Sequence, residues 1–449
     1  MPIEPEQLRR APGGAPVVAL IPWGFAIEDF LEPNGLTLDT FCTQFRGSWM
    51  FGYVEALLTA SVETLLVCFT RSVSTPSRRI HEPTGARVLT LPLPRAYRGL
   101  RRAMADPYGR TTRQMFGAYR GLVGWPLLGP IKELAPYLST PVRPLVRELR
   151  REHVDVMLCQ EYEFPRFDIC VLSKWLHDIP VFGVYQGGDY RRWWLERIIR
   201  PRAIRRCDGV IAGAQAEIDR VTTHYEPRQL ARIPNPVDIR LWCPSDGGEA
   251  RALLELPEGA RIAVWHGRVQ LPKKGLDVLL EAWAMICREE SARELRLVLV
   301  GTGKDSPRIE GAIARSGLDN IIFVNRMLHD PAELRTYLAA ADVYVFPSRH
   351  EGFAVAPVEA MACGLGVVAT DTGGMADILG TGSEASGIIV PQEDPTALAE
   401  GLRRLLHDDA LSRLLGQRAR RRAIEEFSLE AVGAKLRRLL FHGSRAGLG

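Results

Sequence analysis

Residues 347–364 read PSRHEGFAVAPVEAMACG and follow the apolar run DVYVF at 342–346. The run is short and rich in β-branched and aromatic residues, which is typical of a buried parallel strand. Pro357 suits a first helical position, Glu359 would then lie in the first turn, and Gly364 can take the left-handed conformation that ends a helix. The stretch therefore predicts a strand, a loop and a helix that starts at the edge of a sheet.

The start of such a helix presents unpaired backbone N–H groups and a positive dipole end. We expect the amides around Phe353, Ala354 and Val355 to hold phosphate oxygens. Glu351 and Glu359 would repel a bare anion, so we expect them to face hydroxyl groups beside the phosphates, on a sugar and on a ribose. For the glutamates alone, a pair of helix-capping carboxylates is the alternative.

Length and composition limit the class of protein. At 449 residues the chain is too long for one ordinary core, which predicts two domains of roughly 200 residues each. It has no apolar run long enough to span a bilayer, and its first residues lack a signal-peptide core, so we expect a cytosolic protein. The 8 cysteines are scattered, which predicts neither disulfides nor a metal site. A net charge of +4 is too small to indicate nucleic-acid binding.

Strand and helix patterns alternate along the chain. Strands are predicted near 17–21, 64–69, 87–91, 154–159, 181–185 and 208–213, and again near 261–265, 295–300, 321–324, 342–346, 367–370 and 387–390. Strands separated by single helices require right-handed crossovers and a parallel sheet covered on both faces. This order predicts an α/β fold of two Rossmann-like domains that face each other across a cleft.

The two domains are expected at 1–233 and 234–425. Two prolines in IPNPVD at 233–238 resist both helix and sheet, which favours a crossing between domains there. The segment 94–130 interrupts the alternation with Pro, Gly, Arg and aromatic residues, which indicates a basic insertion or a mobile surface segment. A last helix within 426–449 is expected to pack back on the first domain.

Two further motifs follow strands of the second half. Gly267 and Arg268 come directly after one strand, and Lys274 opens the next helix, so both cations should lie at one sheet edge. Arg offers a planar fork and Lys a compact charge, and together they can neutralise a diphosphate. Two solvated cations are the alternative. Gly301 lies in a glycine turn where backbone can approach a ligand, but the third glycine of a dinucleotide fingerprint is missing.

Together these motifs resemble the retaining nucleotide-sugar glycosyltransferases of glycosyltransferase family 4, which have the GT-B fold. The resemblance rests on the two glutamates in EGF and EAMACG, on the GR…KG pair and on PN-x-VD at 234–238, and it is stronger over 234–400 than over 15–230. It implies that Glu359 holds the ribose and that Glu351 and Gly352 meet the donor sugar. It also implies that Arg268 and Lys274 clamp the diphosphate and that Asn325 and Arg326 lie beside the base.

The first half departs from the family pattern. Gln160 stands where many members have a histidine near the reacting sugar, and glutamine donates hydrogen bonds but cannot act as a general base. A glycine pair after the first strand is replaced by WGF at 23–25, and the later GG-x-PE becomes GGMAD at 373–377. Asp189 follows a strand at the cleft and is a candidate for contact with the acceptor or the sugar, with a turn aspartate that caps the next helix as the alternative. His266 and His350 flank the donor motifs, and we expect structural rather than catalytic roles for them.

The expected function is a retaining, metal-independent transfer of a hexosyl group from a nucleotide-diphosphate sugar to a hydroxyl acceptor, as in the synthesis of cell-surface polysaccharide or glycolipid. Gln160, Asp189 and Glu351 are the catalytic candidates. No cofactor is expected besides the nucleotide sugar as co-substrate. The alternatives are a donor-binding protein that has lost catalysis and a nucleotide-sugar epimerase.

Two arginine-rich segments bear on the acceptor. Residues 95–120 hold seven arginines with Tyr97, Tyr108, Phe116 and Tyr119, and residues 191–206 hold seven more with Trp193 and Trp194 nearby. Arginines interleaved with aromatics are typical of surfaces that rest on anionic lipid headgroups, which predicts a peripheral position at the inner membrane face and a lipid-linked acceptor. A solvated basic face or a phosphorylated soluble acceptor is the alternative.

Overall fold

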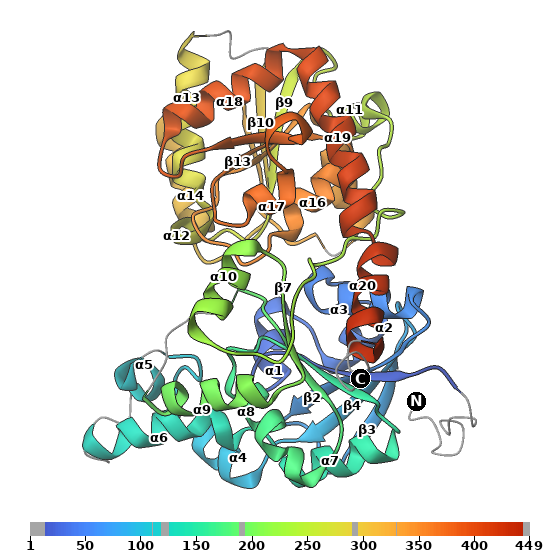
Figure 1. Cartoon of the computed structure of the whole chain (residues 1–449). Coiled ribbons are helices and arrows are strands. Elements are labelled where there is room, and N and C mark those ends of the chain that lie inside the picture. Colours follow the sequence, from blue (N-terminus) through green and yellow to red (C-terminus); the bar gives the residue numbers. More distant parts are fainter. Residues whose placement is uncertain are drawn as a thin grey trace.

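The computed structural model describes residues 14–109, 111–117, 125–187, 194–289, 295–328 and 330–442. The described chain folds into two α/β units stacked end to end, with the second half above the first in Figure 1. The predicted fold class is confirmed. No helix of these residues is long and apolar enough to cross a membrane.

The first half is built on an eight-stranded sheet with the order β3-β4-β2-β1-β5-β6-β7-β8. All neighbours pair in parallel except β3 and β4, which are antiparallel. The strands are β1 (Val17–Ile21), β2 (Glu63–Thr70), β3 (Ser77–His81), β4 (Ala86–Pro92), β5 (Val156–Gln160), β6 (Val181–Val184), β7 (Gly209–Ala212) and β8 (Leu230–Arg232). β1 and β5 lie side by side, although more than 130 residues separate them in sequence. The direction of the strand order therefore reverses between them.

Helices cover both faces of this sheet, and each face has its own apolar core. The helices are α1 (Glu28–Leu31), α2 (Leu38–Thr43), α3 (Ser48–Thr59), α4 (Arg95–Arg102), α5 (Thr112–Phe116), α6 (Trp125–Leu138), α7 (Val142–Arg151), α8 (Pro165–Leu172), α9 (Trp194–Arg206) and α10 (Gln215–His224), with 3-10 turns η2 (Glu32–Asn34) and η4 (Ser173–Leu176). The described part of the 94–130 segment is helical in α4, α5 and the start of α6, so it is not a structureless loop. A small apolar cluster around Met115 and Phe116 holds it together.

The second half is built on a six-stranded, fully parallel sheet with the order β11-β10-β9-β12-β13-β14. Its strands are β9 (Arg261–His266), β10 (Leu295–Val300), β11 (Ile321–Val324), β12 (Val343–Phe346), β13 (Gly366–Thr370) and β14 (Gly387–Val390). Its helices are α11 (Gly247–Leu253), α12 (Leu271–Lys274), α13 (Leu276–Glu289), α14 (Ser306–Ser316), α15 (Pro331–Ala340), α16 (Val355–Ala362), α17 (Met375–Leu379), α18 (Pro395–His407) and α19 (Asp409–Phe427), with the 3-10 turn η6 (Gly382–Glu384). The strand order reverses between β9 and β12.

The chain crosses between the halves twice, and the two crossings lie together. Val237 donates its N–H to the carbonyl of Phe427 at 2.7 Å and forms a β-bridge with Ser428. After the second crossing, α20 (Leu429–His442) packs against α3 of the first half, as Figure 1 shows. At Gly433 an added Cβ would lie 2.0 Å from the carbonyl oxygen of Ala56, so only glycine permits this contact. The last helix therefore ties its own end of the chain to the first half.

The predicted start of the helix within residues 347–364 was wrong. The helix begins at Val355 with Ala354 as its N-cap, so Pro357 is the third helical residue and Glu359 lies in the second turn. The first-turn N–H groups have no intrahelical partner, so proline is tolerated at any of these positions. Gly364 does take the left-handed conformation after the helix, with φ of +85°.

Candidate functional site

The donor motifs lie at the carboxyl ends of β9 and β12, where the strand order of the second sheet reverses. Crevices at such positions are the usual ligand sites of open parallel sheets. Glycines allow the loops here to pack closely: Gly267 has φ of +152° and Gly301 has φ of +136°. An added Cβ on Gly301 would lie 2.0 Å from the carbonyl oxygen of Gly267. The two glycine turns therefore brace each other at this edge.

Lys274 and Glu351 form an ion pair at this edge. The Lys274 Nζ donates to Glu351 Oε1 at 2.5 Å, and the two side chains are 20% and 18% exposed. The backbone holds both loops in place, since Arg349 donates its N–H to the carbonyl of Lys273 at 2.7 Å. An added Cβ on Gly275 would come within 2.0 Å of the carbonyl oxygen of Pro347. The geometry thus brings together one cation and one glutamate of the predicted site.

His266 and Glu359 form a second pair nearby. The His266 Nε2 lies 2.9 Å from Glu359 Oε2, and each residue is 6% exposed. A carboxylate only accepts, so an ionised Glu359 fixes the Nε2–H tautomer of the histidine. The His266 ring also packs against the Tyr344 ring, with centroids 5.3 Å apart. The structural role expected for His266 is therefore to orient the glutamate predicted to hold the ribose.

The remaining donor-side residues surround these two pairs. Arg268 is exposed and forms no hydrogen bond or ion pair with the rest of the described chain, which leaves its guanidinium available. Phe353 and Ala354 are buried at the start of α16, and Val355 is half-buried. Backbone N–H groups at a helix start have no intrahelical partner. The predicted phosphate-binding amides therefore do lie at a helix start.

Asn325 and Arg326 lie at the end of β11, farther along the same edge. Asn325 accepts from the Thr302 Oγ1 at 2.7 Å and donates to Glu310 Oε1 at 2.7 Å. Arg326 pairs with Glu333, and this exposed hydrogen-bonded pair raises the pKa of the arginine. Both predicted base-side residues are therefore already engaged by neighbours on α14 and α15.

The sheet of the first half has a corresponding site at the carboxyl ends of β1 and β5, where its strand order reverses. Gln160 ends β5 and is buried, and Glu161 follows it in the left-handed region with φ of +79°. Beside them, the loop after β1 is held by the buried Arg166, whose guanidinium donates to the carbonyls of Gly24 and Phe25. The WGF loop is therefore a braced element, in which Trp23 is 47% exposed.

The two edges touch through a chain of hydrogen bonds. The Gln186 N–H donates to Glu161 Oε2 at 3.2 Å, and the Gln186 Nε2 donates to Asn235 Oδ1 at 3.2 Å. The Asn235 Nδ2 in turn donates to the carbonyl of Phe353 at 3.4 Å. A crossing residue thus links the first half to the predicted phosphate loop. The sequence motif around Asn235 marked the crossing, but the roles of Glu161 and Gln186 were not predicted.

Glycines let the halves come close at the same place. An added Cβ on Gly352 would lie 2.5 Å from the Cα of Gly187, and one on Gly213 would lie 2.8 Å from the Phe353 ring. Asp377, in the motif that departs from the family pattern, accepts from the Gln215 N–H at 2.7 Å across this contact. The catalytic candidate Asp189 falls outside the described residues.

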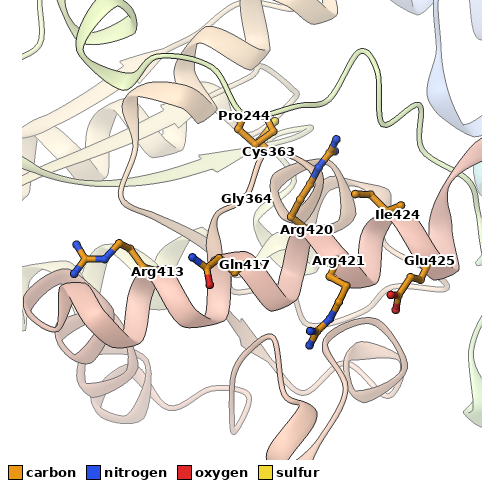
Figure 2. Close-up of a pocket in the computed structure, with 10 residues that line it drawn as sticks. Pro244, Cys363, Gly364, Arg413, Gln417, Arg420, Arg421, Ile424 and Glu425 are labelled. Atoms are coloured by element: carbon orange, nitrogen blue, oxygen red, sulfur yellow. The ribbon is translucent and has the colours of Figure 1, made fainter.

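A separate cavity of about 520 Å³ lies at the far end of α16, between Pro244 and α19. Figure 2 shows Arg420 of α19 reaching toward the loop that carries Pro244. Its guanidinium donates to the carbonyls of Ile239, Trp242 and Ala362. This cavity is thus built around a structural arginine and is not part of the strand-edge site. Among the described residues, no group of three or more His, Cys, Asp and Glu side chains could hold a metal ion.

Comparison with protein families matches both halves of the chain. Residues 108–241 match the model described as Glycosyltransferase Family 4, and residues 260–408 match Glycosyl transferases group 1. Both halves of the chain are therefore similar to glycosyltransferases of the family 4 type. The first matched range ends just after the crossing at 233–238, and the second, which begins at 260, contains every donor-side residue described above.

Curated relatives match this chain over part of its length. The D-inositol 3-phosphate glycosyltransferase of Streptomyces bingchenggensis is 35% identical over 238 residues, 51% of this chain and 51% of that protein. The MMP alpha-(1->4)-mannosyltransferase of Mycolicibacterium hassiacum is 30% identical over 255 residues, 54% of this chain and 58% of that protein. The chain thus spans about half the length of the curated relatives it matches.

Solved structures match the chain over nearly its whole length. Sucrose-phosphate synthase from Thermosynechococcus elongatus aligns with a TM-score of 0.69 at 22% identity, covering 96% of this chain and all of that one. HepE from Anabaena, in complex with UDP, aligns with a TM-score of 0.66 at 16% identity, covering 95% and 99%. These likenesses show the fold, which is the predicted GT-B arrangement.

Proposed function

We propose that the chain is a retaining glycosyltransferase that moves a hexosyl group from a nucleotide-diphosphate sugar to a hydroxyl acceptor. The observation that carries the proposal is the meeting of the Lys274–Glu351 and His266–Glu359 pairs at one strand-order reversal. One edge then offers a cation for phosphate and two carboxylates for hydroxyl groups. The similarity of both halves to glycosyltransferase families supports the same function.

Each donor-side residue has a defined task in this proposal. Arg268, Lys274 and the amides at 353–355 hold the diphosphate, whose growing charge is the obstacle to departure of the nucleotide. Glu359 accepts from the ribose hydroxyls, and Glu351 accepts from the donor sugar. The cations supply the stabilising charge, so the reaction needs neither a metal nor a cofactor beyond its co-substrate.

The first half supplies the acceptor side. In the retaining mechanism that the family resemblance implies, the leaving phosphate helps to deprotonate the acceptor on the same face of the sugar. Gln160 can then position the acceptor or the sugar by hydrogen bonding without acting as a base. The relatives named for D-inositol 3-phosphate and for mannosyl transfer support a hydroxyl on a sugar or cyclitol as the acceptor, free or lipid-linked. A role in cell-surface polysaccharide or glycolipid synthesis follows from a lipid-linked acceptor.

Two linked measurements test the proposal. A panel of nucleotide sugars is screened for the donor that raises the melting temperature, because a ligand that binds only the folded state stabilises it by mass action. That donor is then incubated with candidate acceptors, with and without EDTA, and nucleotide release and the product anomer are measured. The proposal predicts release that EDTA does not reduce and a product that keeps the donor's anomeric configuration. Binding without release for any acceptor would instead indicate a donor-binding protein, and a free altered sugar would indicate an epimerase.

A further inference from the structure

Helix α6 exposes an apolar stripe on the first half. Pro130, Leu134 and Leu138 follow one another at intervals of four residues, which places them on one face of the helix. All three are exposed, and Leu134 and Leu138 reach 50% and 44%. The charged residues of this helix, Lys132 and Glu133, are instead buried and paired with each other. The helix also buries Leu128 and Ala135 in a small apolar cluster, so apolar residues lie on its exposed side as well as on its buried side.

Helix α9 exposes apolar and basic side chains together. Trp194 is 61% exposed and Ile198 is 48% exposed, one turn apart. Four arginines share the exposed side of the helix, namely Arg197, Arg202, Arg205 and Arg206. Of the described chain, no carboxylate pairs with any of the four. The only acidic residue of this helix, Glu196, is buried.

Both helices pack on α8 and share one of its buried carboxylates. Asp168 of α8 accepts from the Tyr137 hydroxyl of α6 at 3.1 Å and from the Arg200 Nε of α9 at 2.6 Å. Figure 1 shows α6 and α9 in the same corner of the first half, away from the second half. Their exposed residues, Pro130, Leu134, Leu138, Trp194, Arg197, Ile198, Arg202, Arg205 and Arg206, are called the α6–α9 surface below.

The aromatic residues expected to accompany the arginines of 95–120 do not form such a surface. Tyr97 is 1% exposed and Phe116 is 2% exposed, so both belong to the interior. Tyr108 stacks on Phe25 with ring centroids 4.9 Å apart, and its hydroxyl accepts from the Phe25 N–H. Tyr119 and Trp193 lie outside the described residues. Tyr108 itself is 38% exposed, so among the described aromatics of that segment Tyr97 and Phe116 are core residues and Tyr108 lies at the surface.

We propose that the α6–α9 surface docks on an anionic lipid bilayer. Its composition suits that partner: Trp, Leu and Ile can enter the headgroup and acyl boundary, and unpaired arginines meet lipid phosphates. Each basic residue near such a membrane contributes about 1 kcal/mol, or roughly fivefold in affinity. A protein partner would need carboxylates placed to match the four arginines, whereas any anionic bilayer supplies negative charge along their whole length. The docking proposal does not depend on the proposed sugar transfer, and it would hold even if the chain had no transferase activity.

Vesicle sedimentation tests the proposal on the full chain. The chain is mixed at low and moderate salt with vesicles of phosphatidylcholine alone or with added phosphatidylglycerol. It should pellet with the anionic vesicles, release as salt rises, and stay in the supernatant with phosphatidylcholine alone. The double variant Trp194→Ser with Ile198→Ser should bind at least tenfold more weakly, and so should Arg197→Gln with Arg205→Gln. Unchanged melting temperatures show that these variants fold.

Matched controls lie on the second half. Leu253 is 74% exposed at the end of α11, and Arg308 and Arg315 belong to α14. Leu253→Ser and the pair Arg308→Gln with Arg315→Gln should bind vesicles like the unmodified chain. A chain that stays in the supernatant at low salt overturns the proposal. So do controls that lose as much binding as the test variants. Self-association that the Trp194 and Ile198 changes abolish, without any vesicle binding, would show a protein interface instead.

Discussion

Replacing Glu359 by Gln tests the division of labour between the two glutamates. Glu359 is 6% exposed, and the one hydrogen-bond partner of its side chain among the described residues is His266, at 2.9 Å. Gln has the same shape, and its amide oxygen can still accept from the His266 Nε2, so the fold should keep its melting temperature within a degree or two. What disappears is the negative charge that we propose faces the nucleotide ribose.

The size of the loss follows from the hydrogen bonds to that charge. A hydrogen bond to a charged group contributes about 1.5–3 kcal/mol, which corresponds to roughly 10- to 150-fold in affinity. Because the ribose belongs to both ligands, Glu359→Gln should weaken the nucleotide sugar and the free nucleotide diphosphate alike. Glu351→Gln should leave the free nucleotide diphosphate almost unaffected, since its proposed contact is with the sugar, and should lower the rate of transfer.

Titration calorimetry with both ligands measures the effect, using the nucleotide sugar that raises the melting temperature. Glu400→Gln is the matched control, because Glu400 is exposed on α18 and remote from the edge in sequence and structure. The reasoning is refuted if Glu351 and Glu359 variants lose the same affinity for both ligands. It is also refuted if Glu359→Gln binds the free nucleotide as tightly as the unmodified chain.

Three more predictions address the clamp, the contact between halves and pH. Lys274→Ala and Arg268→Ala should each lower kcat/KM by about 2–4 kcal/mol, roughly 30- to 1000-fold, and only the Lys274 change should also lower the melting temperature, because it alone breaks an ion pair. Gly352→Ala should separate the halves and reduce transfer, because its Cβ would lie 2.5 Å from the backbone of the first half. Gly99→Ala is the control, because an added Cβ there meets open space. Small-angle scattering measures the separation of the halves, and turnover measures transfer. Burial raises the pKa of Glu55 from 4.5 to about 7 in the folded chain. As pH rises, the carboxyl ionises in the unfolded chain before it ionises in the folded chain, so stability falls between about pH 4.5 and pH 7. Glu55→Gln should therefore gain up to about 3 kcal/mol in urea unfolding at pH 8 and nothing below pH 4.

Most elements of the second half were predictable because each buried parallel strand is one continuous apolar run. The runs at 295–300, 321–324 and 387–390 coincide with the observed strands. The edge strand β3 was missed for a physical reason. Its residues include Arg78, which pairs with Glu148 at 2.7 Å and with Glu152 at 2.6 Å. A strand held by ion pairs to a distant helix carries no alternation of apolar and polar residues, and its partners cannot be identified from local sequence.

The candidate site also has a part that was predictable from the sequence and a part that was not. Residues in one motif, such as Glu351 and Glu359, were predictable because a strand, loop and helix fix their neighbourhood. The partner of Glu359 was not, since His266 lies 93 residues earlier in the chain. The hydrogen-bond chain through Gln186 and Asn235 depends on how two halves meet, and no local pattern reports that. Such long-range polar pairs are set by packing rather than by propensity.

The departures from the family pattern lie where the two halves face each other. Their location indicates which step of the proposed reaction they affect. Gln160 and the WGF loop lie at the first-half edge, and Asp377 receives the Gln215 N–H from the first half. The donor-side residues Lys274 and Glu359, by contrast, each have a partner within the second half. If the first-half edge holds the acceptor, as proposed, a change confined to it should alter which hydroxyl reaches the sugar and leave the proposed diphosphate contacts intact. We therefore expect Gln160→His to shift acceptor preference and to leave donor affinity within about twofold, since Gln160 has no proposed contact with the nucleotide. Calorimetry measures the donor affinity, and turnover with a panel of acceptors measures the acceptor preference. A more than tenfold loss of donor affinity would contradict the proposed separation of donor and acceptor residues.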